Sequence, residues 1–207
     1  MCLIIHKPVG VGIPEELLAA AAAHNPDGWG LMGFDASGRL LLEKHAHVDV
    51  AELIDTEHHL RNAEFALHLR RQTRGGSGID NVHPFKVTDG LYLMHNGTFR
   101  IPSRVHGRSD TWHFVTELLR PLAQRHPGLL SDRAFLQILE FGIRAENKLA
   151  LLDRQENKIA IINRQHGVEL EGLWLSNTRW IDRNLFPLSI TLQPQERSYR
   201  ANELHLV

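Results

Sequence analysis

Cysteine is almost absent from this sequence of 207 residues, which contains a single one, Cys2. One cysteine excludes an internal disulfide and a cysteine-rich zinc site built from this chain. Cys2 stands directly after Met1 and opens a short apolar segment, CLIIH. Both a packing role and a chemical role are therefore open for it.

Long apolar runs and an excess of charge are absent as well. No stretch approaches the roughly 20 apolar residues of a membrane-spanning helix, and the opening MCLIIHKP is too short for the apolar region of a signal peptide. Lysine and arginine number 23 against 24 for aspartate and glutamate, a formal charge of -1. We therefore expect a cytoplasmic protein that binds neither membranes nor nucleic acid.

The length is enough for one substantial core, so we expect a single domain over residues 1–207. The pattern runs from strands through helices and back to strands, which favours an α+β fold with antiparallel sheets. The expected strands are 2–6, a hairpin within 30–44, 64–70, 91–94, 148–153, 158–163, 172–177 and a last run near 187–192. The expected helices are 13–24, 49–61, 109–126 and 131–143.

Cys2 could combine a nucleophile and a base in one residue. Removal of the initiator Met1, which is common before a small residue, would leave the thiol and a free α-amino group together. An α-amine has a pKa of about 7.7 to 8.0, so a fraction of it can accept the thiol proton near neutral pH. The alternative is that Cys2 is a small buried apolar side chain in a strand.

Three later segments carry motifs in a fixed order: HLRRQTRGGSGIDNVHPF at 68–85, LMHNGTF at 93–99 and SDT at 109–111. They resemble the H-x-R-x-x-T-x-G and N-x-H-P, H-N-G and S-D-T motifs of the class II glutamine amidotransferases, which are N-terminal nucleophile hydrolases. The resemblance implies a four-layer αββα sandwich, two antiparallel sheets between helices. It places Cys2 at the start of a central strand.

The same resemblance implies how a glutamine head would be bound. Arg70 would hold the α-carboxylate with its planar, charged fork of donors. Asp110 would accept hydrogen bonds from the α-ammonium group. Thr73 and His83 would line the glutamine pocket, and a loop at 74–80 would close over the substrate.

The oxyanion of the reaction would be held by the side-chain amide of Asn96 and the backbone N–H of Gly97. Each of these motifs also has an ordinary structural interpretation. Asn-Gly is the commonest two-residue hairpin turn, and Ser109-Asp110 suits a helix cap. Arg70 and Arg71 could be a solvated pair at the end of a strand.

Two departures from the family pattern bear on the substrate. Arg71 stands where the family often has an aromatic residue, and Trp112 replaces the glutamate of S-D-T-E. An amide with an additional negative charge, such as a γ-glutamyl compound, could use Arg71. The alternatives to a glutaminase are therefore a free-standing amidohydrolase acting on another amide and, less favoured, a non-catalytic binding module.

The expected reaction needs no cofactor and no metal. The chain has 14 histidines, and HAH at 45–47 could project two rings to one face of a strand, but a third ligand at a recognisable spacing is missing. The reaction is release of ammonia from glutamine by thioester formation on Cys2. Because the chain leaves no room for a fused synthase, we expect a separate acceptor subunit for the ammonia.

Overall fold

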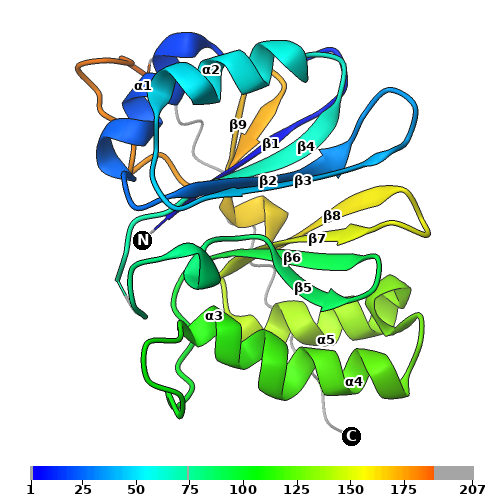
Figure 1. The fold of residues 1–207 in the computed structure, drawn as a ribbon. Coiled ribbons are helices and arrows are strands. Elements are labelled where there is room, and N and C mark those ends of the chain that lie inside the picture. The colour runs from blue at the N-terminus through cyan, green and yellow to red at the C-terminus, as the bar shows by residue number, and fades with distance from the viewer. Residues whose placement is uncertain (1, 74, 189–207) are drawn as a thin grey trace, which may run out of the picture.

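Two antiparallel sheets stack face to face between layers of helices in the computed structural model, which describes residues 2–73 and 75–188 (Figure 1). One sheet has the strand order β3-β2-β4-β1-β10-β9 and the other β5-β6-β7-β8. Helices α1 and α2 cover the outer face of the first sheet, and α3, α4 and α5 cover that of the second. The expected α+β fold with an αββα sandwich is confirmed.

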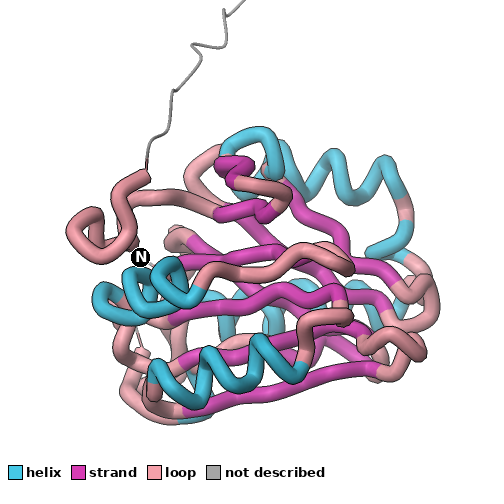
Figure 2. The backbone as a smooth tube through the Cα atoms, turned by 90° about the horizontal axis from the view of Figure 1, so that it is seen from above, coloured by secondary structure: helices cyan, strands magenta, loops and turns pink. Residues whose placement is uncertain are grey.

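The first sheet is built from β1 (Leu3–Lys7), β2 (Trp29–Phe34), β3 (Leu40–His45), β4 (Glu64–Leu69), β9 (Val168–Leu170) and β10 (Leu173–Leu175). The second contains β5 (Phe85–Thr88), β6 (Leu91–Asn96), β7 (Lys148–Asp153) and β8 (Lys158–Ile162). The α-helices are α1 (Glu15–His24), α2 (Val50–His59), α3 (Asp110–His113), α4 (Arg120–Arg125) and α5 (Arg133–Ile143). Viewed from above, α1 and α2 lie over the strands of the six-stranded sheet (Figure 2).

Strand β1 is central in the first sheet, between β4 and β10. Its side chains alternate: Leu3 and Ile5 pack in the core beneath α1 and α2, whereas Ile4 packs in the core between the two sheets. Because the period of a strand is two residues, Cys2, directly before β1, falls on the side that faces the second sheet. The expectation that Cys2 stands at the start of a central strand agrees with this topology.

The sequence expectations for the regular elements hold with local differences. Asp49 caps α2 through its side chain, which accepts hydrogen bonds from the backbone N–H groups of Ala51 and Glu52. The expected helix at 109–126 forms as α3, a π-helical segment at Phe114–Leu119 and α4. Strands β5 and β9, of four and three residues, were not expected from the sequence. The run near 187–192 lies largely outside the described residues.

The turns of the β2–β3 and β7–β8 hairpins lie at the end of the sandwich opposite Cys2. Trp29 pairs with Leu69, near Cys2, whereas Phe34 at the other end of β2 leads into the turn before β3. In the second sheet, β7 and β8 are joined by the turn at 154–157. A Cβ added to Gly38 in the first turn would lie 3.8 Å from the side-chain amide of Asn157 in the second. The two turns therefore lie side by side.

Lys7 is a buried lysine at the far end of β1. Its side chain donates to the carbonyl oxygens of Arg61 and Ala63, both at 2.8 Å, and to that of Leu60 at 3.4 Å. These carbonyls follow α2, where helix ends leave oxygen atoms without partners. Burial lowers the pKa of Lys7, and the charge of Glu57 raises it. Lys7 thus joins the central strand to the end of the helix above it.

We expect Lys7→Met to lower the free energy of unfolding by about 2 to 4 kcal/mol, because methionine keeps much of the volume but leaves buried carbonyl groups unpaired. Urea denaturation of the two proteins at pH 7 measures this difference. Lys158→Met, at an exposed lysine of β8, is the matched control and should change stability by less than about 0.5 kcal/mol. Equal effects of the two variants would contradict the role given to Lys7.

Candidate active site

Cys2, Arg70, Asn96 and Asp110 converge at one end of the space between the sheets. Leu3 pairs with Leu69 in the antiparallel β1–β4 register. Cys2 and Arg70 are therefore the next two residues to face each other, just beyond the ends of these adjacent strands. The charges of Arg70 and Asp110 both act on the Cys2 thiol. The structure therefore brings together residues that are separated by up to 108 positions in the sequence.

Ser176 connects Asn96, in the second sheet, to β1 in the first. Its hydroxyl oxygen accepts a hydrogen bond from the backbone N–H of Ile4 at 2.8 Å and one from the Asn96 side-chain amide at 2.7 Å. The Ser176 backbone N–H also donates to the Ile4 carbonyl at 2.9 Å. Ser176 is fully buried, so this connection excludes water and fixes Asn96 relative to the strand that follows Cys2.

Cys2 is half-buried, and its thiol lies near the backbone of Arg71. Its sulfur is 3.5 Å from the Arg71 carbonyl oxygen. Burial raises the pKa of the Cys2 thiol, while the positive charge of Arg70 lowers it. The Asn177 side-chain amide donates to the Cys2 carbonyl at 3.0 Å. The hydrogen bond to its backbone carbonyl therefore fixes the position of Cys2, and its sulfur faces the site.

Arg70 is buried, and its contacts with the described residues engage only part of its guanidinium. One terminal nitrogen donates to the Gly76 carbonyl at 3.0 Å and the other to the Asp27 carbonyl at 3.4 Å. Burial lowers the pKa of Arg70, and the charges of Cys2 and Asp27 raise it. A guanidinium has five N–H donors, so donors remain for a carboxylate. The solvated-pair interpretation of Arg70 is therefore wrong.

Arg71 has a different environment from Arg70. Its guanidinium donates to the His24 carbonyl at 2.9 Å and stacks on the Trp180 ring at 4.9 Å from the ring centre. These contacts attach the residue after β4 to the end of α1 and to the segment after β10. The Arg71 side chain therefore already has partners within the protein.

The backbone at Gly97 is shaped by Asn147. Gly97 has φ +150°, and a Cβ there would collide with the Asn147 side chain and approach the His95 ring at 2.8 Å. The Asn147 side-chain oxygen accepts a hydrogen bond from the Thr98 backbone N–H at 2.8 Å. Glycine is required at this position, and the chain continues into the loop at 98–109. The hairpin interpretation of Asn96-Gly97 is therefore wrong.

His95 also stabilises the turn at Gly97. Since the Asn147 side-chain oxygen is an acceptor, His95 donates to it through Nε2 at 2.9 Å, and Nδ1 accepts from the Thr111 hydroxyl at 2.8 Å. Burial lowers the pKa of His95, which favours this neutral form. The ring thereby joins the turn after β6 to helix α3.

Asp110 is not the helix cap that the sequence also allowed, because Ser109 takes that role. The cap of α3 is Ser109, whose hydroxyl accepts from the Trp112 backbone N–H at 3.1 Å. One carboxylate oxygen of Asp110 accepts from the Phe99 backbone N–H at 2.6 Å. No second hydrogen bond to this carboxylate comes from the described residues, so its other oxygen is free to meet a cationic group.

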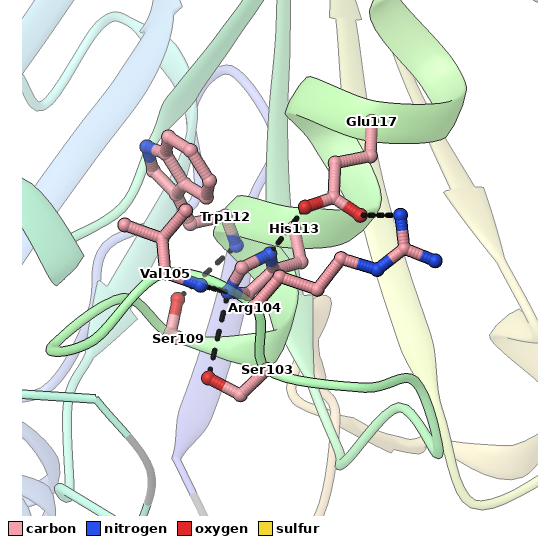
Figure 3. A network of polar contacts seen from close by, with 7 residues as sticks. All are labelled: Ser103, Arg104, Val105, Ser109, Trp112, His113 and Glu117. Atoms are coloured by element: carbon pink, nitrogen blue, oxygen red, sulfur yellow. Dashed lines mark hydrogen bonds and ion pairs between the residues drawn. The ribbon is translucent and has the colours of Figure 1, made fainter.

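The loop between Gly97 and Asp110 is anchored by His113, which lies in the interior of the network drawn in Figure 3. His113 contacts Glu117 through Nδ1 at 2.7 Å, and its Nε2 lies 3.5 Å from both the Ser103 hydroxyl and the Val105 backbone nitrogen. Arg104 makes a longer contact with Glu117, at 3.9 Å. The loop that joins the oxyanion candidate to Asp110 is therefore attached to α3 and the segment after it.

Thr73 and His83 are the site candidates with the least structural support. Thr73 is exposed, and its side chain makes no hydrogen bond with the described residues. His83 is buried between the sheets, with its ring 3.9 Å from that of His68 and 4.8 Å from that of Phe85. Their assignment to the substrate pocket stays a prediction.

The residues that support the site were not singled out by the sequence. Asp27 accepts from the Gln72 backbone N–H at 2.7 Å, Asn147 shapes the turn at Gly97, and Ser176 connects the sheets. All three are small polar residues at the ends of expected elements, in NPDGWG, before KLALLD and in GLWLSN. Their position at the ends of expected elements was the only signal that the sequence offered. It could not identify their partners, which lie tens of residues away.

Histidine, cysteine, aspartate and glutamate do not gather in a group of three that could hold a metal ion within residues 2–73 and 75–188. His45, in the HAH segment, instead stacks on Trp29 at 4.1 Å. In the same part of the chain, none of the helices is both long enough and apolar enough to span a membrane.

Comparison with known proteins identifies the family. The family model for glutamine amidotransferases class-II matches residues 15–148, which include Arg70, Asn96 and Asp110 but not Cys2. The match covers more than half of the chain, and the protein therefore belongs to the class II glutamine amidotransferases. A search of curated proteins gave no match.

Solved structures that match the chain include a glutamine aminotransferase class-II domain protein from Silicibacter pomeroyi. It is 18% identical, with 74% of this chain and 73% of that chain covered and a TM-score of 0.37. A second is the glutamine phosphoribosylpyrophosphate amidotransferase from B. subtilis, 15% identical, with a TM-score of 0.41. That alignment covers 84% of this chain and 41% of the other.

The buried histidines next to the site make stability depend on pH. Burial lowers the pKa of His68 to about 3 and lowers that of His83 well below its ordinary value. An unfolded histidine binds a proton below about pH 6.5, whereas these rings stay neutral in the fold. Stability present at neutral pH is therefore lost as the pH falls from about 6.5 toward 3.

We expect the free energy of unfolding to fall by about 1.4 kcal/mol per pH unit for each such histidine between pH 6 and pH 4. Urea denaturation at several pH values measures this slope, and His68→Gln should make it shallower. His126→Gln, at an exposed histidine, should leave the slope unchanged. A slope that is the same in the wild type and in His68→Gln would contradict the neutral state of this ring.

Proposed function

We propose that this protein is a glutaminase that uses Cys2 to cleave the side-chain amide of glutamine and release ammonia. The observation that carries this proposal is the convergence of a thiol, a guanidinium with unused donors and a carboxylate with a free oxygen. Membership of the class II glutamine amidotransferases agrees with it. We propose one catalytic domain over residues 1–207 that needs no cofactor.

The arrangement of charges supports a free amino acid as substrate. Arg70 would bind the α-carboxylate, and Asp110 would bind the α-ammonium group through the oxygen that Phe99 leaves free. Two opposite charges read at once distinguish an amino-acid head from a simple amide. Asparagine, shorter by one methylene, would place its amide short of the Cys2 sulfur.

The chemical steps follow from the groups present. The Cys2 sulfur attacks the amide carbon, and the negative charge develops on the carbonyl oxygen. The Asn96 amide has a second hydrogen beyond the one given to Ser176, and with the Gly97 N–H it would stabilise this oxygen. Ammonia leaves when the carbon–nitrogen bond breaks, and water then hydrolyses the thioester to release glutamate.

The base in this proposal is the α-amino group of Cys2, which requires removal of Met1. A free amine with a pKa near neutrality can take the thiol proton, give it to the leaving ammonia and later activate water. Because burial raises the pKa of the thiol, such a base is needed for attack near neutral pH. The ammonia would pass to a separate acceptor enzyme.

A γ-glutamyl or other charged amide is the less favoured substrate. That alternative relies on Arg71, whose guanidinium is already bound to the His24 carbonyl and the Trp180 ring. These contacts fix the Arg71 side chain, and the guanidinium whose charge acts on the Cys2 thiol is that of Arg70. We therefore favour free glutamine.

The first test is mass spectrometry before and after incubation with the glutamine analogue 6-diazo-5-oxo-norleucine. We expect a protein without Met1 that gains one adduct on Cys2, and excess glutamine should prevent the labelling. Cys2→Ala is the control and should gain no adduct. Retention of Met1 together with an unreactive thiol would overturn the proposal.

A second prediction concerns the substrate ammonium group. Asp110→Asn keeps an oxygen that can accept from the Phe99 N–H but removes the charge. We expect kcat/KM for glutamine to fall by about 10- to 100-fold, the value of a charged hydrogen bond of about 1.5 to 3 kcal/mol. Steady-state ammonia release measures it. Asp55→Asn, at an exposed carboxylate, should be indistinguishable from the wild type, and a similar result for Asp110→Asn would exclude ammonium binding by Asp110.

A further inference from the structure

Asn81 lies between the two loops that lead to the substrate-binding candidates. It is buried, with 3% of its surface exposed. Its side-chain amide donates to the Gly76 carbonyl at 3.0 Å and to the Gly107 carbonyl at 2.8 Å. Its side-chain oxygen accepts from the Ser109 backbone N–H at 2.9 Å. A single side chain therefore connects the loop after β4 to the loop before α3.

Each contact of Asn81 is one step from a proposed substrate-binding group. The Gly76 carbonyl that accepts from Asn81 also accepts from the Arg70 guanidinium at 3.0 Å. Ser109 is the cap of α3 and directly precedes Asp110. The position of Asn81 therefore bears on Arg70 through a shared carbonyl and on Asp110 through the backbone next to it.

The two loops also approach closely without a side chain between them. A Cβ on Gly75 would lie 2.9 Å from the Ser109 nitrogen and 3.1 Å from the Asn81 amide nitrogen. The Gly76 N–H donates to the Gly107 carbonyl at 2.8 Å. Loops have few such fixed contacts of their own, so a planar amide with two donors and one acceptor determines how they sit.

The neighbouring ion pair between Arg108 and Asp80, at 2.7 Å, also joins these loops. Its side chains are 31% and 67% exposed, and exposed ion pairs contribute little because water and salt screen them. The buried hydrogen bonds of Asn81 are therefore the stronger link. Arg108→Gln provides a matched control on the same two loops.

We propose that Asn81 is a positioning residue that sets the separation between Arg70 and Asp110, and thereby selects a substrate head that carries both a carboxylate and an ammonium group. This inference rests on the proposed glutaminase function and deepens it. Asn81 does not touch the reacting atoms. Its loss should therefore affect binding of the amino-acid head and leave the reactivity of Cys2 unchanged.

The test is Asn81→Asp, which keeps the volume and the oxygen that accepts from Ser109 but cannot donate to Gly76 or Gly107. We expect KM for glutamine to rise by about tenfold or more, with kcat within about threefold of the wild type. Labelling of Cys2 by iodoacetamide, a small neutral electrophile, should keep its rate, while labelling by 6-diazo-5-oxo-norleucine should slow in parallel with the change in KM.

Two controls separate positioning from loss of stability. Lys7→Met also removes buried donations to backbone carbonyls, but at the opposite end of β1, and should lower stability with KM unchanged. Arg108→Gln should alter KM by less than about threefold. Asn81→Ser is a second variant at the same position, and it should raise KM in the same direction.

Several results would overturn the inference. These are an unchanged KM in folded Asn81→Asp, a parallel loss of kcat and iodoacetamide reactivity, or failure of both Asn81 variants to fold, which would assign Asn81 to the fold alone. If the wild type releases no ammonia from glutamine, the proposed function and this inference fall together. If the wild type is active and the variants match it, only the inference falls.

Discussion

A buried hydroxyl group, that of Ser176, joins the two sheets at the Cys2 end beside the site. Ser176 accepts from β1 in the first sheet and from Asn96 in the second, so the nucleophile candidate and the oxyanion candidate share a single anchor. Sheet packing alone fixes the distance between layers but tolerates sliding along them. A directional hydrogen bond at the end of the sandwich removes that freedom. The remaining site contacts, from Arg70 to Asp110, are arranged around this fixed point.

Around that anchor the site is supported mostly by neutral groups. Carbonyl oxygens hold Arg70, amide groups hold the turn at Gly97, and a neutral imidazole joins that turn to α3. Buried charges are costly unless they are paired, and contacts within residues 2–73 and 75–188 leave part of the hydrogen-bonding capacity of Arg70 and Asp110 unused. Their pairing is left for a ligand. The protein thereby keeps strong electrostatic interactions available at the place where a zwitterion would bind.

Much of the fold and the main site candidates could be predicted from the sequence, because local patterns carried them. Alternation and capping residues located most strands and helices, and the resemblance of three motifs to those of a known family indicated Arg70, Asn96 and Asp110. The supporting residues could not be found in this way. Ser176 contacts Asn96 across 80 positions and Ile4 across 172, and nothing near Ser176 in the sequence specifies either partner. Asn81 was visible as part of a motif, but its contacts appear only in three dimensions.

The two adjacent hairpin turns at 35–39 and 154–157 lie at the end of the sandwich opposite the candidate site. The residues proposed for binding and chemistry lie at the Cys2 end, whereas these turns connect strands at the other end. A peptide tag, a fluorophore or a surface linkage placed in either turn would meet solvent rather than the site. If catalysis requires a free α-amine at Cys2, the N-terminus cannot be extended, but the protein can still be labelled or immobilised through these turns.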